Sequence, residues 1–173
     1  MDTALQNTVF AKAVQAGVIP WLKGCSVINR NPLVNGVRLD FLLKCRELEV
    51  LVETKSAVLR GPNGEAMYPD CPSARGRKHV RTLIELASAG RRTAFVFIAA
   101  LPGVRCFKPY REGDPVMEAL IADAIKRGVE VRSLSMYMDE EGYVYIEDPD
   151  LPLCEDFIRH YRLSYNTTAN HRP

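Results

Sequence analysis

Two carboxylates and one lysine lie in neighbouring apolar segments of this chain, where charged side chains need an explanation. Asp40 lies in the segment VRLDFLL, and Glu53 and Lys55 lie in the next one, LEVLVETKSAVL. Carboxylate oxygens bind hard divalent cations, and a lysine beside them can orient or help deprotonate a water that attacks a phosphate. These residues predict a catalytic site in which Asp40 and Glu53 hold Mg²⁺ or Mn²⁺ and Lys55 positions the attacking water.

Strand geometry decides which of these side chains can reach one site. Side chains alternate along a strand, so Glu53 and Lys55 should face one side while Thr54 faces the other. Asp40, at the end of the preceding strand, would complete a pair of carboxylates, which repel each other unless a cation lies between them. A structural alternative stays open, in which Glu53 and Lys55 form a buried ion pair with no catalytic role.

A second candidate group lies in the basic segment PDCPSARGRKHVR, residues 69–81. The residues that would share one face of a helix are Arg75, Lys78, His79 and Thr82. Arg77 and Arg81 would lie on the more exposed side of that helix. The start of a helix also offers backbone donors and a partial positive charge, so this segment could bind DNA phosphates. An ordinary solvated basic helix is the alternative.

The elements that must position these groups are predicted from periodicity and from turn residues. Helices are predicted over residues 4–15, 73–88, 115–127 and 156–161. Strands are predicted over residues 26–34, 37–43, 48–59, 65–68, 93–101, 129–137 and 143–146, with an irregular stretch at 102–109. Asn35 and Gly36 predict a hairpin turn, Ser73 and Asp114 are predicted N-caps, and Gly76 would let its helix lie close to a sheet.

The order of the larger elements is α-β-β-β-α-β-α-β, which predicts an α/β fold with a mixed sheet flanked by helices. Residues 1–150 are expected to form one domain. Residues 151–173 are expected to form a C-terminal tail that is partly disordered.

Composition argues against a disulfide-rich, zinc-binding or membrane-spanning protein and limits how this chain could bind nucleic acid. The chain has 173 residues, of which 47% are hydrophobic and 25% charged, and its net charge of +2 requires any nucleic-acid affinity to come from a local basic patch. The five cysteines are widely spread, so neither a disulfide framework nor a zinc site is indicated. Because no apolar run approaches the ~18 residues of a membrane span, a cytoplasmic protein without a membrane partner is expected.

Several segments resemble the sugar fermentation stimulation protein A (SfsA) family. They are DTALQN, AVQAGVIP, VRLDFLL, VETKSAVL, YPDCPSARGRKHVRTLIEL, FKPYREGDP and GVEV. Together they cover about residues 2–137, which corresponds to the C-terminal portion of that family. The most specific part is the PD-x-P-[ST]-x-RGRKH run at residues 69–79, together with R-x-DFLL and VE-x-KS.

This resemblance implies a restriction-endonuclease-like fold of the PD-(D/E)xK type and a DNA-binding protein with a proposed regulatory role in sugar metabolism. It implies that Asp40 and Glu53 are metal ligands and that Lys55 is the lysine of the motif. The residues that it places on a phosphate-binding helix are Arg75, Lys78 and His79. Asn7 matches an asparagine of the family's first segment, and Arg77 is a further candidate from the basic run.

The chain also departs from the family pattern. Family members carry an N-terminal OB-like domain, and this chain begins where that domain would end. Three alternatives are open: a naturally shortened form, a gene fragment, or a single-domain relative with a separately encoded OB-like partner. A homo-oligomer is a further candidate. Thr8 lies where a basic residue is usual, and Tyr110 where an asparagine is usual. From the carboxylates, the lysine, the basic helix and the family resemblance, the favoured function is a DNA-binding, divalent-metal-dependent phosphodiesterase. The alternative is a non-catalytic, non-specific DNA-binding regulator linked to sugar (maltose) metabolism.

Overall fold

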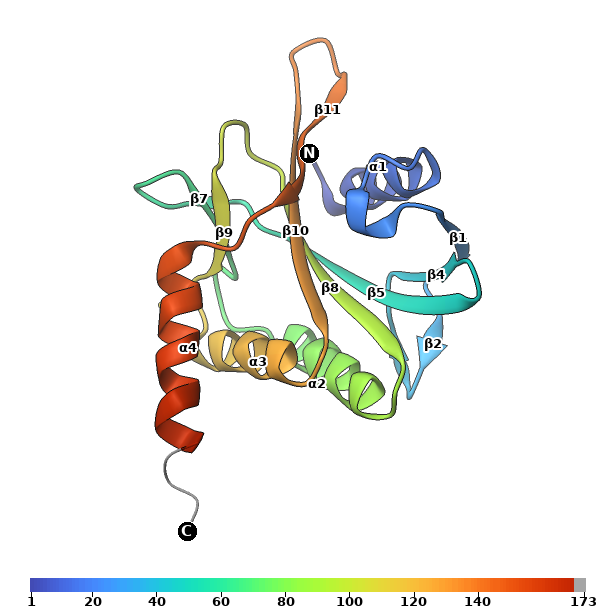
Figure 1. The fold of residues 1–173 in the computed structure, drawn as a ribbon. Helices are drawn as coiled ribbons and strands as arrows, with labels where there is room; N and C mark the ends of the chain where they lie inside the picture. Colours follow the sequence, from blue (N-terminus) through green and yellow to red (C-terminus); the bar gives the residue numbers. More distant parts are fainter. Residues whose placement is uncertain (170–173) are drawn as a thin grey trace.

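The computed structural model describes the backbone of residues 1–169 and the side chains of residues 1–162, and a six-stranded mixed sheet forms its centre (Figure 1). In sheet order the strands are β1 (Cys25–Arg30), β4 (Phe41–Cys45), β5 (Leu48–Ser56), β8 (Arg92–Ala99), β10 (Glu130–Met138) and β11 (Val144–Leu151). β5, β8 and β10 run parallel, and the outer strands pair antiparallel. The predicted central strand is confirmed, because β8 is buried from Thr93 to Ala99.

Helices cover both faces of this sheet. They are α1 (Thr3–Gln15), α2 (Ala74–Ser88), α3 (Pro115–Lys126) and α4 (Glu155–Ala169), with a short 3₁₀ helix η1 (Pro20–Leu22). α1 lies on one face, and α2 and α3 lie on the other (Figure 1). The order α1-β1-β4-β5-α2-β8-α3-β10 matches the predicted one, so the restriction-endonuclease-like mixed α/β fold is confirmed.

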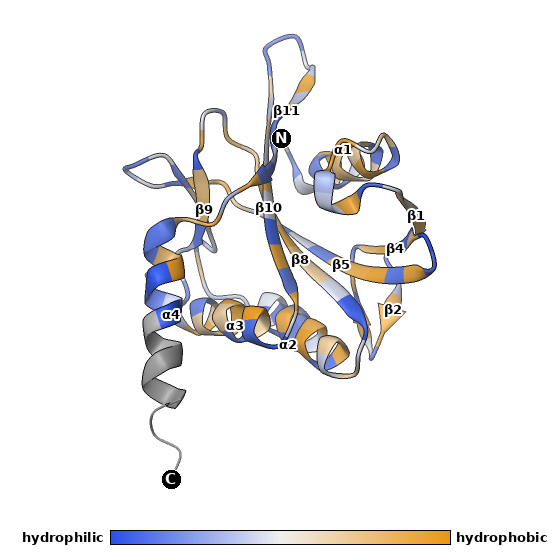
Figure 2. Cartoon of the chain, in the orientation of Figure 1, coloured by the Kyte–Doolittle hydropathy of each residue, from blue (hydrophilic) through white to orange (hydrophobic). Residues whose placement is uncertain are grey.

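Alternating side chains of the central strands divide the core into two clusters. The side chains that pack towards α1 include Val50, Val52, Ala94, Val96 and Ile98, together with Phe10 and Val14 of the helix itself. Those that pack towards α2 and α3 include Leu51, Phe95, Phe97, Val80, Leu83, Met117 and Ile121. Figure 2 shows apolar residues along β5 and β8 and hydrophilic residues at the tip of the hairpin between β10 and β11. A strand buried on both faces has a continuous run of apolar residues in its sequence, and this pattern made β8 predictable.

The turns and helix caps predicted from local residue patterns are confirmed. Asn35 and Gly36 link β2 (Leu33–Val34) to β3 (Val37–Arg38), and both have positive φ, 50° and 73°. A two-residue hairpin turn of this handedness favours asparagine followed by glycine. Ser73 caps α2 through a hydrogen bond to its Oγ from the Gly76 amide, and Asp114 caps α3 ahead of Pro115.

Several predicted boundaries were wrong. The strands expected at 26–34 and 37–43 are interrupted, because Asn31 adopts a positive φ of 56° and Asp40 lies in a bend between β3 and β4. The strand expected at 143–146 continues to Leu151, and the helix expected at 156–161 is longer, since α4 runs to Ala169. Residues 170–173 lie outside the described residues. The division into a domain over residues 1–150 and a tail stays a prediction.

A second sheet packs beside the first. It consists of β6 (Leu59–Arg60), β7 (Glu65–Tyr68) and β9 (Cys106–Pro109). The return strand expected at 65–68 is confirmed, but part of the expected irregular stretch is the strand β9. β9 pairs in parallel with β7, and its buried Phe107 stacks on Phe97 with ring centroids 4.0 Å apart. This strand depends on partners distant in sequence, which local residue patterns do not reveal.

The expectation that no disulfide would form was wrong. Cys25 bonds to Cys45 across the antiparallel pair β1–β4, and Cys106 on β9 bonds to Cys154 just before α4. Each pair meets only after segments separated in the sequence have packed together, so the spacing along the chain gave no sign of it. No helix among residues 1–169 is both long and apolar enough to cross a membrane.

An ion pair joins α2 to α3. Arg77 Nη2 lies 2.7 Å from Asp114 Oδ1, and Arg77 Nε lies 2.9 Å from Oδ2. The Asp114 carboxylate is fully buried and also accepts from the amides of Val116 and Met117. The hydrogen bonds from Arg77 lower the pKa of Asp114 below its ordinary value, against the effect of burial. Arg77, which was expected on the more exposed side, is therefore engaged in holding two helices together.

We expect Asp114→Ala to lower the free energy of unfolding by about 3 kcal/mol, because it removes a helix cap and leaves Arg77 without its carboxylate. Urea denaturation measures this change. Asp123→Ala, which breaks an exposed pair with Arg127, is the matched control and should cost less than about 1 kcal/mol. Equal effects of the two substitutions would contradict the structural role of Asp114.

Glu65 on β7 should make stability depend on acidic pH. Burial opposes its ionisation, but hydrogen bonds from backbone amides, Lys108 and Asn63 outweigh burial and lower its pKa from 4.5 to about 2. Because the folded pKa is depressed, the stabilisation is present above about pH 4.5 and is lost as the pH falls towards 2. We expect Glu65→Gln to flatten the stability profile in this range, measured by denaturation at each pH. Glu140→Gln, at an exposed site, should leave the profile unchanged.

Candidate functional site

The predicted catalytic residues meet near the end of β5. By strand alternation Glu53 and Lys55 face α2, whereas Thr54 faces α1. Asp40 precedes β4, the antiparallel neighbour of β5, and its amide donates to the Val52 carbonyl over 3.1 Å. The sheet register therefore brings Asp40 next to the strand that carries the other two residues, as the sequence predicts.

Glu53 is the most buried of these charged residues. Its side chain is only 2% exposed, and one oxygen, Oε1, lies 2.5 Å from Lys55 Nζ and also contacts His79 Nδ1. Lys55 Nζ and His79 Nδ1 are themselves 3.3 Å apart. The second oxygen, Oε2, is buried and has no hydrogen-bond partner. Glu53 therefore has one fully engaged oxygen and one open coordination position.

Asp40 is held by Thr54. Its Oδ2 accepts from the Thr54 amide at 2.8 Å and from the Thr54 hydroxyl at 2.6 Å. Burial raises the pKa of Asp40 and the charge of Glu53 raises it further, while the hydrogen bonds from Thr54 lower it. Because Asp40 is bonded to Thr54, the residue next to Glu53 on β5, the charge of Glu53 can act on Asp40.

Asn7 of α1 reaches the same group through Thr54, whose Oγ1 lies 2.7 Å from Asn7 Oδ1. The hydroxyl has one proton for two acceptors. When Asp40 is ionised, Thr54 donates to Asp40. When Asp40 is protonated, Asp40 can donate to Thr54 and Thr54 to Asn7, so the arrangement serves both forms of the carboxyl group.

The basic segment divides into three environments. Arg75 and Lys78 are exposed on the first turns of α2, where a phosphate could reach them. His79 is 5% exposed and lies with Glu53 and Lys55, not with the exposed cations. Arg77 is bonded to Asp114. Arg75 and Lys78, together with the exposed Arg81 one turn further along α2, therefore stay available as surface phosphate contacts.

The carboxylates offer a partial ligand set for a divalent cation. Among the described residues no group of three or more His, Cys, Asp and Glu side chains is arranged to hold a metal. The open Oε2 of Glu53 and the neighbouring Asp40 nevertheless suit a cation that keeps several waters, such as Mg²⁺. The residues fit such an ion if the Thr54 carbonyl, water or phosphate oxygens complete its coordination.

Thr54 and Tyr68 also shape the site, although sequence reasoning gave neither side chain a role. The position of Thr54 between Glu53 and Lys55 could have indicated its role, because strand alternation turns its side chain to the other face of the sheet. Tyr68 on β7 has its pKa raised to about 12 by burial and then by the charges of Glu53, Asp114 and Asp70. A Cβ at Gly76 would lie 2.9 Å from the Tyr68 hydroxyl oxygen, so the glycine admits this ring against α2.

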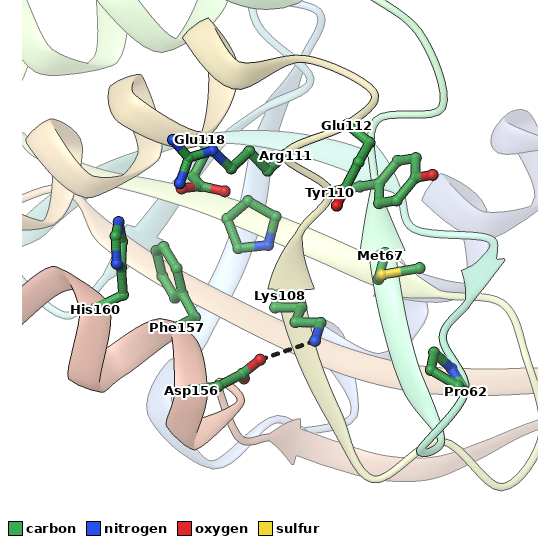
Figure 3. Close-up of a pocket in the computed structure, with 11 residues that line it drawn as sticks. Pro62, Met67, Lys108, Tyr110, Arg111, Glu112, Glu118, Asp156, Phe157 and His160 are labelled. Carbon is green, nitrogen blue, oxygen red and sulfur yellow. Dashed lines mark hydrogen bonds and ion pairs between the residues drawn. The ribbon is translucent and has the colours of Figure 1, made fainter.

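A groove of about 350 Å³ lies apart from these residues, between β7, β9, the loop after β9, α3 and α4 (Figure 3). Its side chains include Lys108, Arg111, Glu118, Asp156 and Phe157. Lys108 Nζ is 2.9 Å from Asp156 Oδ2, and Arg111 and Glu118 extend towards each other (Figure 3). None of the residues predicted to act in catalysis lines this groove. The candidate site is therefore identified from the carboxylates of Asp40 and Glu53 and not from this groove.

Comparisons with known proteins identify the family to which the chain is similar. A family model described as "Sugar fermentation stimulation protein RE domain" matches residues 4–142. A sugar fermentation stimulation protein homolog of Pyrococcus furiosus is 50% identical over 145 residues, which are 83% of this chain and 62% of the relative. The homolog of Archaeoglobus fulgidus is 42% identical over 152 residues, which are 87% of this chain and 63% of the relative.

A solved structure of Pyrococcus furiosus SfsA in complex with Ca²⁺ superposes with a TM-score of 0.85 and 46% sequence identity, covering 88% of this chain and 65% of that one. The chain thus spans less than two thirds of the length of these relatives. The family model nevertheless covers most of the chain. This chain belongs to the sugar fermentation stimulation protein family.

Proposed function

We propose that this domain binds DNA and hydrolyses phosphodiester bonds with the help of a divalent cation, Mg²⁺ or Mn²⁺. The observation that carries the proposal is the buried, unpartnered Oε2 of Glu53 beside Asp40, with Lys55 on the same side of β5. A buried carboxylate oxygen without a donor costs free energy unless a cation or water meets it. The relative from Pyrococcus furiosus was solved with Ca²⁺, a hard cation that takes oxygen ligands.

Each residue then has a defined role. Asp40 and Glu53 Oε2 would hold the cation, which supplies Lewis-acid activation of the phosphate and of a water. Thr54 keeps Asp40 in place through two hydrogen bonds. Lys55, held by Glu53, orients the attacking water and balances the negative charge that collects around the phosphate.

Arg75 and Lys78 are proposed to guide the DNA backbone. Both are exposed on α2, the helix that also brings His79 to Glu53, so a strand lying along them would pass near the carboxylates. The net charge of the chain is only +2, and local cations of this kind must therefore supply the attraction.

A non-catalytic DNA-binding regulator is the second candidate. It is favoured by the ion pair that Glu53 already makes with Lys55, by the contact of Glu53 with His79, and by the small number of carboxylates near the site. A separately encoded OB-like partner or a second copy stays a proposal from the family resemblance. A cytoplasmic location and a link to sugar metabolism stay proposals from the family alone.

Metal-dependent cleavage tests the first candidate. We expect single-stranded or duplex DNA to be cut with Mg²⁺ or Mn²⁺ but not with a chelator, and Asp40→Asn or Lys55→Ala to reduce the rate by at least about 100-fold. Products are resolved on denaturing gels, with Asp123→Asn as the control for loss of a surface carboxylate. Intact DNA in every lane, together with a salt-sensitive mobility shift, would favour the regulator.

Phosphate contacts by α2 can be tested by binding alone. We expect Arg75→Ala and Lys78→Ala to weaken duplex binding similarly for all sequences, and each to reduce the slope of log K against log salt concentration by about 0.9. Fluorescence anisotropy with a chelator present measures the slope without cleavage. Arg127→Ala, exposed at the end of α3, is the matched control and should leave the slope unchanged.

A further inference from the structure

His79 is too enclosed to act as a surface phosphate ligand. Its side chain is 6% exposed, whereas Arg75 and Lys78 of the same helix are exposed. Its Nδ1 contacts the Glu53 carboxylate, a group 26 residues earlier in the chain and on a different element. Through this contact, α2 holds the side chain of Glu53 on β5.

The direction of this hydrogen bond follows from its acceptor. A carboxylate oxygen can only accept, so the proton lies on Nδ1 and the imidazole donates to Oε1. Lys55 donates to the same oxygen from 2.5 Å. Oε1 thus accepts two hydrogen bonds, and Oε2 accepts none. The two bonds to Oε1 hold the carboxylate in an orientation in which Oε2 has no donor.

Lys55 alone does not fix this orientation. It has a long side chain with rotatable bonds, is 19% exposed, and stands only two residues from Glu53 on the same strand. Without a second donor the carboxylate could rotate and present both oxygens to the ammonium group. His79 comes from α2, whose position is set by the core contacts of Val80 and Leu83, and so it provides a fixed reference.

We propose that His79 is a positioning residue that orients Glu53 so that Oε2 stays available as a cation ligand. This inference rests on the proposed metal site and adds a residue that acts on it through Glu53. Hydrogen bonds to a ligating carboxylate commonly change metal affinity by about 10- to 100-fold.

Two amide substitutions separate the donor from the rest of the ring. In His79→Asn the side-chain nitrogen lies near the place of Nδ1, whereas in His79→Gln it lies nearer to that of Nε2. We expect His79→Asn to bind Mn²⁺ within about threefold of the wild type, and His79→Gln and His79→Leu to bind at least about tenfold more weakly. Isothermal titration calorimetry without DNA at one fixed pH measures these affinities.

Metal-free measurements guard against a purely structural effect. Urea denaturation in chelator shows whether each variant is folded, and the ¹³C carboxyl resonance of Glu53 reports the environment of its side chain. We expect one sharp resonance in the wild type and His79→Asn, and a shifted or broadened one in His79→Gln and His79→Leu. Equal Mn²⁺ affinity in all variants, or equal loss in His79→Asn and His79→Leu, would overturn the positioning role. Absence of Mn²⁺ binding by the wild type would instead overturn the proposed metal site on which that role depends.

Discussion

The carboxylate of Glu53, almost wholly removed from water, is the constraint that the packing around it must satisfy. An ionised group in such a place is tolerated only when donors or a cation surround it. Lys55 supplies one donor from the same strand and His79 supplies another from α2. His79 reaches this carboxylate because core contacts of Val80 and Leu83 hold α2 on the sheet, and Gly76 allows Tyr68 to fit against the same helix.

Three consecutive residues of β5 connect the two helical layers. Glu53 and Lys55 meet α2 on one face, and Thr54 meets Asn7 of α1 on the other. Asp40, which precedes the neighbouring strand β4, is bound to both the amide and the hydroxyl of Thr54. A change in the register of β5 by one residue would exchange these faces, so pairing with β4 and β8 controls the site as strongly as the side chains themselves.

Features encoded within a few residues or between adjacent strands were predictable, and features that depend on contacts between distant segments were not. The Asn35–Gly36 turn, the Ser73 cap and the Asp114–Pro115 helix start each follow from local backbone chemistry. β9, the pairing of the cysteines and the partner of Arg77 depend on segments far apart in sequence. The proximity of Asp40 to Glu53 was predictable because the strands are neighbours. The burial of His79 was readable as well, since it precedes Leu83 and Leu86 at helical spacing, but the basic residues around it suggested the surface.

The bond between Cys106 and Cys154 closes a covalent ring with a sequence separation of 48, which contains α3, β10 and β11. The exposed tip of the hairpin near Glu141 lies inside this ring. A protease that cuts one peptide bond at the tip would therefore leave a single molecule of unchanged mass apart from one added water. Its two pieces would separate only after reduction and unfolding. In this part of the protein, a cut in the peptide chain therefore does not divide the molecule.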